Sequence, residues 1–287
     1  MSAPLTIAIT GANSGIGLRA TARLARAGHR VLALCRDPER SRSAIATATA
    51  GAPGVQIIRA DMSDPASIRA AVSELENQGP LDSLINNAAV FDQNQRVAQF
   101  TPGGHEVFWA TNHLGPFELT ARLSPLLARA PRPRVVFVAS KGLVTMPRIR
   151  IRFDDLDSPD WYTPARAYYH AKLAQIMTAL MLAERVPATV RVTCVRVPAV
   201  RLDSARLATQ PWLLRLLYAP KNALAAEPDL LAATYERAAT GGASSPSIYI
   251  DEADRPASPP ASAADADQRH HLWDVTQRAV GDPRWAW

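Results

Sequence analysis

The sequence predicts an α/β fold in which parallel strands form a doubly wound sheet with helices on both faces. One observation behind this prediction is that short apolar runs alternate with helical stretches of about 10 to 15 residues along most of the chain. The other is a glycine-rich turn that directly follows the first apolar run. Both features are typical of proteins that bind ligands at the carboxyl edge of a parallel sheet.

Seven strands are expected, each from a short apolar run. They cover residues 5–10, 31–35, 55–60, 81–86, 134–140, 189–197 and 247–250. Helices are expected between them at residues 15–28, in the Ala-rich stretch that runs to about residue 50, and at 65–78, 104–129 and 164–186. Because apolar strands alternate with helices, the sheet should be parallel and covered on both faces.

Three stretches interrupt the alternation. Residues 141–163 and 198–226 are insertions that begin where a strand ends, at the edge where such sheets bind ligands. Residues 255–267 are rich in Pro, Ala and Ser, and we expect a surface loop there.

The composition places the chain among ordinary globular proteins, and the length of 287 residues is compatible with one domain covering residues 1–287. The net charge is +6, but the arginines are scattered singly, which argues against nucleic-acid binding. No apolar stretch is long enough for a membrane span and no secretory leader precedes the first strand, so we expect a cytoplasmic protein without membrane contacts. Cys35 and Cys194 lie in apolar runs and should be buried free thiols.

The glycine-rich turn has the sequence TGANSGIG, residues 10–17. Gly11, Gly15 and Gly17 permit a tight turn and let backbone N–H groups approach a pyrophosphate at the start of the following helix. A flexible turn without a ligand is the simpler alternative, but the position between a strand and a helix favours a Rossmann-type nucleotide site. Asn13, Ser14 and Ile16 complete the predicted turn.

The spacing G-x-x-x-G-x-G resembles the short-chain dehydrogenase/reductase family, and further motifs follow in the family's order. They are Asp61 with Met62, the NNAA stretch containing Asn87 and Ala88, Asn112, Ser140, the Y-x-x-x-K pair Tyr168 and Lys172, and Pro198 after the sixth strand. The resemblance extends from Leu5 to about Arg284 and implies a nicotinamide cofactor. It also implies that Asp61 contacts the adenine and that the NNAA stretch supports the cofactor.

The second strand ends at the position that distinguishes the two nicotinamide cofactors. An acidic residue there accepts a hydrogen bond from the free ribose hydroxyl of NAD, but this chain has Cys35 followed by Arg36. A guanidinium can bind a phosphate dianion, so NADP(H) is the expected cofactor. In the alternative, Arg36 is a solvated loop residue and Asp37 reaches the ribose hydroxyl.

Tyr168 and Lys172 are four residues apart in a helical stretch and share one face. A nearby ammonium should lower the pKa of the tyrosine and make it a general acid–base. The family resemblance implies that Lys172 also holds the nicotinamide ribose, that Ser140 bonds the substrate carbonyl, and that Asn112 fixes a water between Lys172 and solvent. A surface Tyr and Lys on a helix is the simpler alternative.

Three neighbouring residues are weaker candidates for proton transfer. Tyr169 is adjacent to Tyr168, but its partner four residues on is Leu173, which carries no charge. His113 and His170 lack a sequence partner of the triad type, so packing roles are expected for both.

The long insertion after Ser140 and the C-terminal sequence resemble the retinol-dehydrogenase-like and WW-domain-oxidoreductase-like branch of the family, and the missing N-terminal anchor suggests a soluble, bacterial-type member. One departure concerns the sixth strand. The family usually continues with P-G and then a Thr that contacts the nicotinamide carboxamide, whereas this chain has Ala199 for the glycine and no Thr in register. Ser204 or backbone groups could replace that contact.

Two functions remain open on the sequence. The leading one is an NADP(H)-dependent reductase that interconverts a ketone or aldehyde and an alcohol; the alternative is a non-catalytic NADP-binding redox sensor on the same fold. Trp212 and Tyr218 lie in an apolar segment expected to form a substrate lid at 198–226, which suggests a bulky apolar or secondary-metabolite ketone. Packing of that segment on the core or on a second subunit is the alternative, and the sequence is compatible with a homo-oligomer.

Overall fold

The computed structural model describes residues 3–157, 160–198, 227–242 and 245–287. Within them, seven strands form one fully parallel sheet in the order β3-β2-β1-β4-β5-β6-β7. The strands are β1 Thr6–Thr10, β2 Arg30–Cys35, β3 Val55–Arg59, β4 Ser83–Asn86, β5 Arg134–Ser140, β6 Arg191–Val197 and β7 Tyr249–Ile250. The predicted doubly wound sheet is confirmed, and each expected strand is present.

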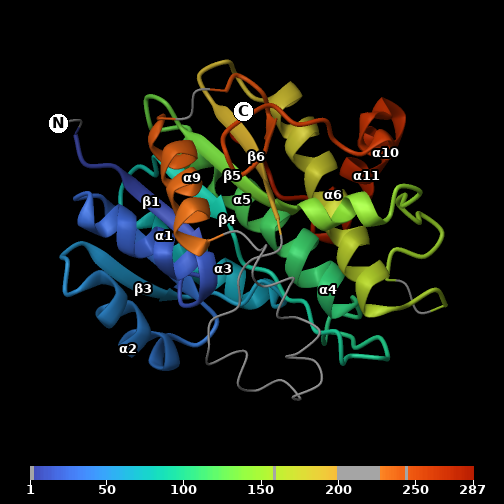
Figure 1. Ribbon diagram of the computed structural model, residues 1–287, viewed down its shortest axis with the longest axis horizontal. Helices are drawn as coiled ribbons and strands as arrows, with labels where there is room; N and C mark the ends of the chain where they lie inside the picture. The colour runs from blue at the N-terminus through green and yellow to red at the C-terminus, as the bar shows by residue number, and fades with distance from the viewer. Residues whose placement is uncertain (1–2, 158–159, 199–226, 243–244) are drawn as a thin grey trace.

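Helices cover both faces of the sheet (Figure 1). On one face lie α1 Gly15–Arg26, α2 Pro38–Thr49 and α9 Pro228–Thr240, with α1 and α9 side by side. On the other lie α3 Pro65–Glu76, α4 Val107–Trp109, α5 Gly115–Leu127, α6 Pro164–Arg185, α10 Ala261–Ala264 and α11 Ala266–Ala279. Two short helical turns also occur: η1 Ala110–Leu114 is a π-helix, and η2 Lys141–Thr145 is a 3-10 helix.

Each face of the sheet has its own hydrophobic core. The alternation of side chains along β1 divides its residues between them, because Ile7 and Ile9 join the cluster under α1, α2 and α9 whereas Ala8 joins the cluster under α3, α5 and α6. Both cores contain fully buried aromatic residues, Tyr235 in the first and Phe117 in the second. This double coverage explains why the strands read as continuous apolar runs.

The strand order reverses direction at β1, which has β2 on one side and β4 on the other. Consecutive crossovers therefore leave in opposite directions and open a crevice at the carboxyl ends of these strands. The glycine-rich turn follows β1 and the NNAA stretch follows β4, so both predicted cofactor motifs border this crevice.

The helix expected at 104–129 begins later, at Val107, and contains a π-helical turn. Pro116 has no N–H to donate to the carbonyl of Asn112, so a regular α-helical bond cannot form there. Gly115 lies against the backbone of Met62, where a Cβ would collide with the carbonyl oxygen. The chain therefore widens into η1 just before it approaches the loop after β3.

The expected loop at 255–267 is partly wrong, because residues 261–264 form α10 and α11 begins at Ala266. Asp265 ends the irregular stretch by accepting a hydrogen bond from the N–H of Gln268 (3.1 Å) as the N-cap of α11. The C-terminal tail then crosses α5, where the ring of Trp285 lies 5.3 Å from that of Phe117 and the N–H of Ala286 donates to the hydroxyl of Ser124 (2.9 Å).

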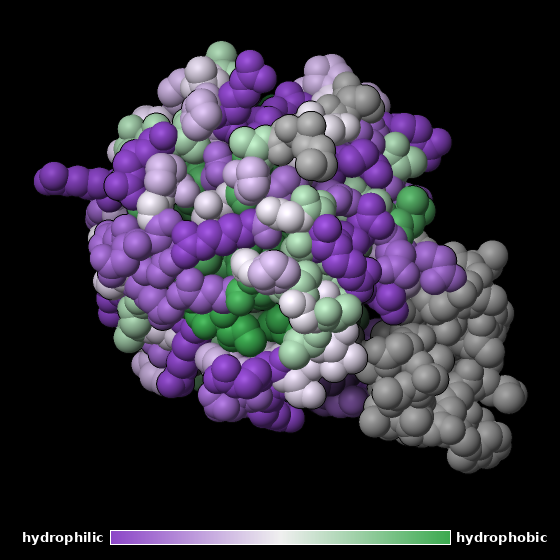
Figure 2. Space-filling model, turned by 90° about the vertical axis from the view of Figure 1, so that its left-hand side faces the viewer, coloured by the Kyte–Doolittle hydropathy of each residue, from purple (hydrophilic) through white to green (hydrophobic). Residues whose placement is uncertain are grey.

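The side of the molecule that carries β3 and α2 has a mainly hydrophilic surface around a smaller hydrophobic area (Figure 2). Both cysteines are buried free thiols, as predicted. Among the helices of the described residues, none combines the length and apolar character needed to cross a membrane.

Candidate active site

The glycine turn is built by close backbone contacts between the ends of β1 and β4. Gly11 has φ +64° and a Cβ on it would lie 3.0 Å from the Cα of Ala88, while a Cβ on Gly17 would collide with the carbonyl oxygen of Gly11. Side chains at these two positions would push the turn away from the sheet, which explains the glycines.

Asn87 and Ala88 hold this turn in place. The side-chain amide of Asn87 donates to the carbonyls of Thr10 (2.9 Å) and Gly11 (3.2 Å). The backbone N–H groups of Asn87 (3.0 Å) and Ala88 (2.9 Å) donate to the hydroxyl of Thr10. The NNAA stretch thus holds the turn through hydrogen bonds. Thr10 belongs to this network and was not predicted from the sequence.

The start of α1 fits a pyrophosphate. Gly15 has φ +54° and no atom lies within 4 Å of where its Cβ would be, so this side of the turn is open. Ser14 is exposed, its side chain makes no capping bond, and no acidic residue lies in the first turn of α1. The free N–H groups of this 12-residue helix are therefore available to an anion.

The two residues predicted to lie near the adenine, Asp61 and Met62, already make contacts within the protein. One carboxylate oxygen of Asp61 accepts hydrogen bonds from the backbone N–H (2.9 Å) and hydroxyl (2.7 Å) of Ser63. Met62 is buried in the core beneath Gly115. A contact of either residue with adenine stays a prediction.

Arg36 and Asp37, the two candidates for the ribose contact after β2, have different surroundings in the structure. Arg36 is exposed, and its side chain forms no hydrogen bond or ion pair with any described residue. The carboxylate of Asp37 instead caps α2, accepting from the N–H of Arg40 (3.1 Å), and Cys35 is buried behind it. Asp37 therefore already has a structural role, whereas Arg36 is free to bind an anion.

Ser140 and Tyr168 meet at the carboxyl end of β5. The Ser140 hydroxyl interacts with that of Tyr168 and acts to lower its pKa, and the N–H of Gly142 donates to the Ser140 oxygen (3.2 Å). Burial raises the pKa of Tyr168 to about 12. The sequence predicts that Lys172 lowers this pKa, and this prediction is wrong: burial of the phenol has the largest effect, and a smaller effect of Tyr169 acts in the same direction.

Lys172 is almost completely buried, and burial lowers its pKa to about 8. Its ammonium donates to the carbonyl of Val138 (2.8 Å) and to the side-chain oxygen of Gln175 (3.0 Å). The sequence analysis missed Gln175, although its position three residues after Lys172 on one helix could have revealed it.

Tyr169 reaches the same serine as its neighbour. The side chains of Thr145 and Ser140 both act to lower the pKa of its hydroxyl, although burial raises that pKa overall, and its ring lies 5.2 Å from that of Tyr168. A Cβ on Gly142 would collide with the Tyr169 hydroxyl, so the glycine makes room for it.

Asn112 is buried in η1 and its side chain binds the loop after β4. Its amide oxygen accepts from the N–H of Val90 (2.8 Å) and its amide nitrogen donates to the Val90 carbonyl (3.0 Å). The next residue, Phe91, places its ring 4.4 Å from that of Tyr168. Asn112 thus fixes the loop that covers the tyrosine, and Phe91 is a site residue for which the sequence carried no signal.

His113 and His170 have the predicted packing roles. Both are buried and burial lowers the pKa of each to about 3, so they are neutral. Their rings lie 4.4 Å and 4.8 Å from that of Trp109, respectively.

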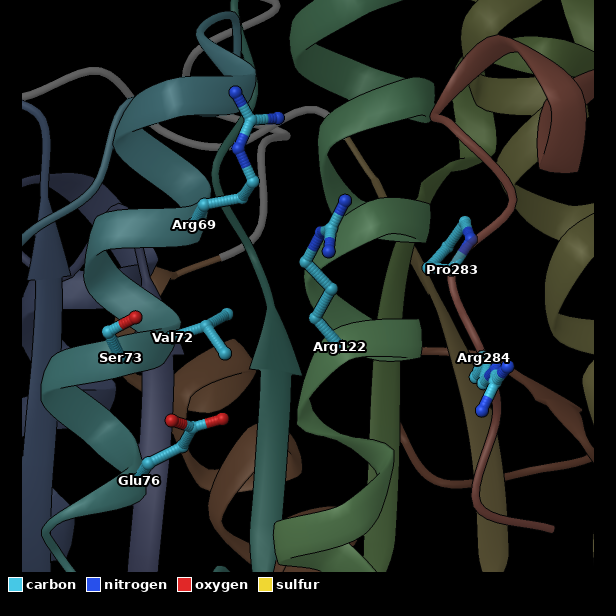
Figure 3. Close-up of a pocket in the computed structure, with 7 residues that line it drawn as sticks. All are labelled: Arg69, Val72, Ser73, Glu76, Arg122, Pro283 and Arg284. Atoms are coloured by element: carbon cyan, nitrogen blue, oxygen red, sulfur yellow. The ribbon is translucent and has the colours of Figure 1, made fainter.

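A hollow of about 330 Å³ lies between α3, α5 and the C-terminal tail (Figure 3). Its lining comprises Arg69, Val72, Ser73, Glu76, Arg122, Pro283 and Arg284. Arg122 (2.7 Å) and Arg69 (3.7 Å) both pair with the buried carboxylate of Glu118. No candidate catalytic residue lines this hollow.

The predicted lid lies outside the described residues, together with Trp212, Tyr218, Ala199 and Ser204. Pro198 is described and directly follows β6, as expected.

Known proteins resemble this chain over most of its length. The family model for short chain dehydrogenases matches residues 5–150. The human dehydrogenase/reductase SDR family member 13 is 34% identical, over 96% of this chain and 73% of the human protein. Human retinol dehydrogenase 14 is 36% identical, over 74% of this chain and 67% of the human protein. A crystal structure of an uncharacterized protein from Mycobacterium paratuberculosis superposes with a TM-score of 0.72, at 26% identity, over 99% of this chain and 96% of that one. The chain, with its parallel sheet, glycine turn and Ser140–Tyr168–Lys172 cluster, therefore belongs to the short-chain dehydrogenase/reductase family of oxidoreductases, as a retinol-dehydrogenase-like member.

Proposed function

We propose that this protein is an NADP(H)-dependent enzyme that interconverts a ketone or aldehyde and the corresponding alcohol. The observation that carries the proposal is that Tyr168 lies close enough to Ser140 for the serine to act on its pKa, with the Lys172 ammonium 5.9 Å from the centre of the tyrosine ring. A nicotinamide cofactor supplies or accepts the hydride when bound. The chain's own residues then have to orient the carbonyl and move one proton.

The proton step follows from the state of the tyrosine. Because its pKa is raised, Tyr168 is protonated at neutral pH and can donate to the carbonyl oxygen as that oxygen gains negative charge. Ser140 is placed to bond the same oxygen and orient the carbonyl. The tyrosinate left behind is stabilised by the Lys172 ammonium. In the oxidative direction the same proton returns to the tyrosine.

Three observations support NADP(H) as the cofactor: the exposed, unpaired Arg36, the use of Asp37 as a helix cap, and the absence of an acidic residue in the first turn of α1. A ribose phosphate beside Arg36 would form a charge-assisted contact, whereas NAD offers no anion there.

A bulky, largely apolar substrate is supported by Phe91. Its side chain is 42% exposed although its ring lies against Tyr168, so it presents an apolar surface next to the reacting position. A second ring, that of Phe108, lies 6.5 Å behind it. A substrate with an apolar body would cover this surface and gain its burial.

The experiment is to follow NADPH oxidation with a panel of ketones and aldehydes graded in size and polarity, with NADH in parallel. We expect turnover that is fastest with bulky apolar carbonyl compounds and NADPH. Tight NADPH binding without turnover of any of them would favour the non-catalytic redox sensor.

A further inference from the structure

The insertion after η2 carries an alternating sequence, Arg-Ile-Arg-Ile-Arg at residues 148–152, that the proposed function does not use. Ile151 is buried and Ile149 packs against the core, whereas Arg148 and Arg150 are exposed. The isoleucines therefore anchor the segment, and the arginines are left at the surface.

A hollow of about 470 Å³ lies over this segment. Four arginines and four less polar residues line it: Arg148, Arg150, Arg152, Arg166, Met146, Pro147, Ile149 and Trp161. This volume lies in the range of about 300 to 1,000 Å³ that is typical of small-molecule sites. The mixture of guanidinium groups with an apolar floor suits a ligand that is anionic at one end.

The four arginines of this hollow differ in their partners. Arg152 pairs with Asp154 (3.0 Å) and lies 5.9 Å over the ring of Trp161. The side chains of Arg148, Arg150 and Arg166 form no hydrogen bond or ion pair within the described ranges. The nearby acidic residues Asp154, Asp155 and Asp160 act on Arg152, and Asp154 also interacts electrostatically with Arg150.

The hollow in Figure 3 provides a contrast. Two of its three arginines pair with the buried carboxylate of Glu118, which offsets part of their charge. In the hollow over residues 148–152, by contrast, Arg166 lies in the first turn of α6, where the helix dipole adds to its positive charge and that turn contains no acidic residue. An anionic ligand bound there would offset this charge.

Trp161 is held in a fixed orientation. Its indole N–H donates to the carbonyl of Asp155 (3.3 Å), and its ring lies edge to face with His170 at 4.9 Å. A ring that is fixed before binding costs little entropy when a flat group packs against it.

We propose that this hollow binds a small molecule that carries a phosphate or carboxylate on a flat apolar group. The arginines at 148, 150 and 166 bind the anion, and Trp161 with Met146 and Ile149 contacts the apolar part. The hollow shares α6 with the proposed active site, since Arg166 precedes Tyr168 by two residues, but none of its lining residues belongs to the Ser140–Tyr168–Lys172 cluster. It is distinct from the glycine turn and does not depend on the proposed reaction.

The test is calorimetric titration of the full chain with 1-naphthyl phosphate, 1-naphthol and inorganic phosphate, in the presence of saturating NADP⁺ so that the cofactor site is filled. We expect 1-naphthyl phosphate to bind most tightly. Arg148→Ala and Arg166→Ala should each weaken it by about tenfold, the scale of a charge-assisted contact. Arg132→Ala is the matched control, since Arg132 is also exposed but lies at the amino end of β5, two residues before the strand begins.

Equal affinity for 1-naphthol, or unchanged binding in both hollow variants, would overturn the proposal. A second outcome would also overturn it: 1-naphthyl phosphate does not bind, but the protein sediments with phosphatidylglycerol vesicles and this sedimentation is lost in the Arg148 and Arg166 variants. The arginines would then contact a lipid surface. Circular dichroism of each variant checks that these exposed substitutions leave the fold intact.

Discussion

The ammonium nitrogen of Lys172 lies 5.9 Å from the centre of the Tyr168 ring. It donates two of its three protons to protein acceptors, the Val138 carbonyl and the Gln175 side chain. The third remains for a ligand or for the tyrosine. The lysine is thus positioned by its own helix and by β5, while its charge faces the group proposed to transfer the proton.

Gln175 should control the pH at which Lys172 loses its proton. With a Lys172 pKa of about 8, we expect kcat/KM to fall as the pH rises through that value, because the neutral amine no longer stabilises the tyrosinate. Gln175→Leu removes an acceptor of the ammonium and should move this fall to lower pH, whereas Gln175→Glu should move it to higher pH.

The measurement is the pH profile of kcat/KM for the wild type and both variants. A role of Gln175 in packing alone would lower activity at every pH and leave the midpoint in place. That outcome would exclude Gln175 as a positioning residue for Lys172.

Arg36 should determine cofactor preference. We expect tighter binding of NADPH than of NADH, and Arg36→Ala should narrow the difference by about tenfold or more, since a charge-assisted contact is lost. Fluorescence titration with both cofactors measures this. Arg40→Ala, another exposed arginine next to Asp37, should leave the ratio unchanged. Equal affinities in the wild type would refute the assignment.

Phe91 should affect large substrates more than small ones. Phe91→Ala removes an aromatic contact whose burial is worth about 1 to 3 kcal/mol, so KM for a bulky apolar ketone should rise about tenfold. KM for a small aldehyde should change little. Phe100→Ala is the control, because Phe100 is similarly exposed, at 48%, and does not contact Tyr168. The same increase in KM for both substrates would contradict this role.

Glu106 should make stability depend on pH. Its carboxylate is buried and caps α4 by accepting from the N–H of Trp109 (2.9 Å), and burial, with a smaller effect of Asp157, raises its pKa to about 7. Because this pKa is higher in the folded than in the unfolded protein, the free energy of unfolding should fall as the pH rises from about 4.5 through 7.

Glu106→Gln keeps the capping oxygen but removes the charge. The free energy of unfolding of the variant minus that of the wild type should therefore be larger at pH 8 than at pH 5. We expect this increase to be on the order of 1 to 3 kcal/mol. Urea unfolding at both pH values measures the difference. An identical difference between variant and wild type at pH 5 and pH 8 would show that Glu106 is charged in the folded protein at both.

The sequence predicted the sheet and the position of the glycine turn between β1 and α1, because both depend on local patterns. Apolar runs mark buried strands, and Gly11 and Gly17 are required by backbone contacts that no other residue permits. Phe91 could not be predicted, because its contact with Tyr168 depends on how Asn112 holds the loop after β4.

The sign of the Tyr168 pKa shift was also beyond the sequence. Spacing reveals the neighbouring charge of Lys172, but burial depends on the packing of distant segments. The same reason explains Tyr169, whose hydroxyl reaches Ser140 only because Gly142 leaves space for it.

The central claim is that Tyr168 transfers the proton, and the most direct test compares Tyr168→Phe with Tyr169→Phe in single-turnover reduction of a ketone by bound NADPH. Each substitution removes one hydroxyl and keeps the ring. We expect Tyr168→Phe to lower the rate by about 10² or more with NADPH affinity nearly unchanged, and Tyr169→Phe to lower it far less, since general acid catalysis contributes on the order of 10² to 10⁴. A Tyr168→Phe enzyme that keeps most of its rate, while Tyr169→Phe loses it, would contradict the account.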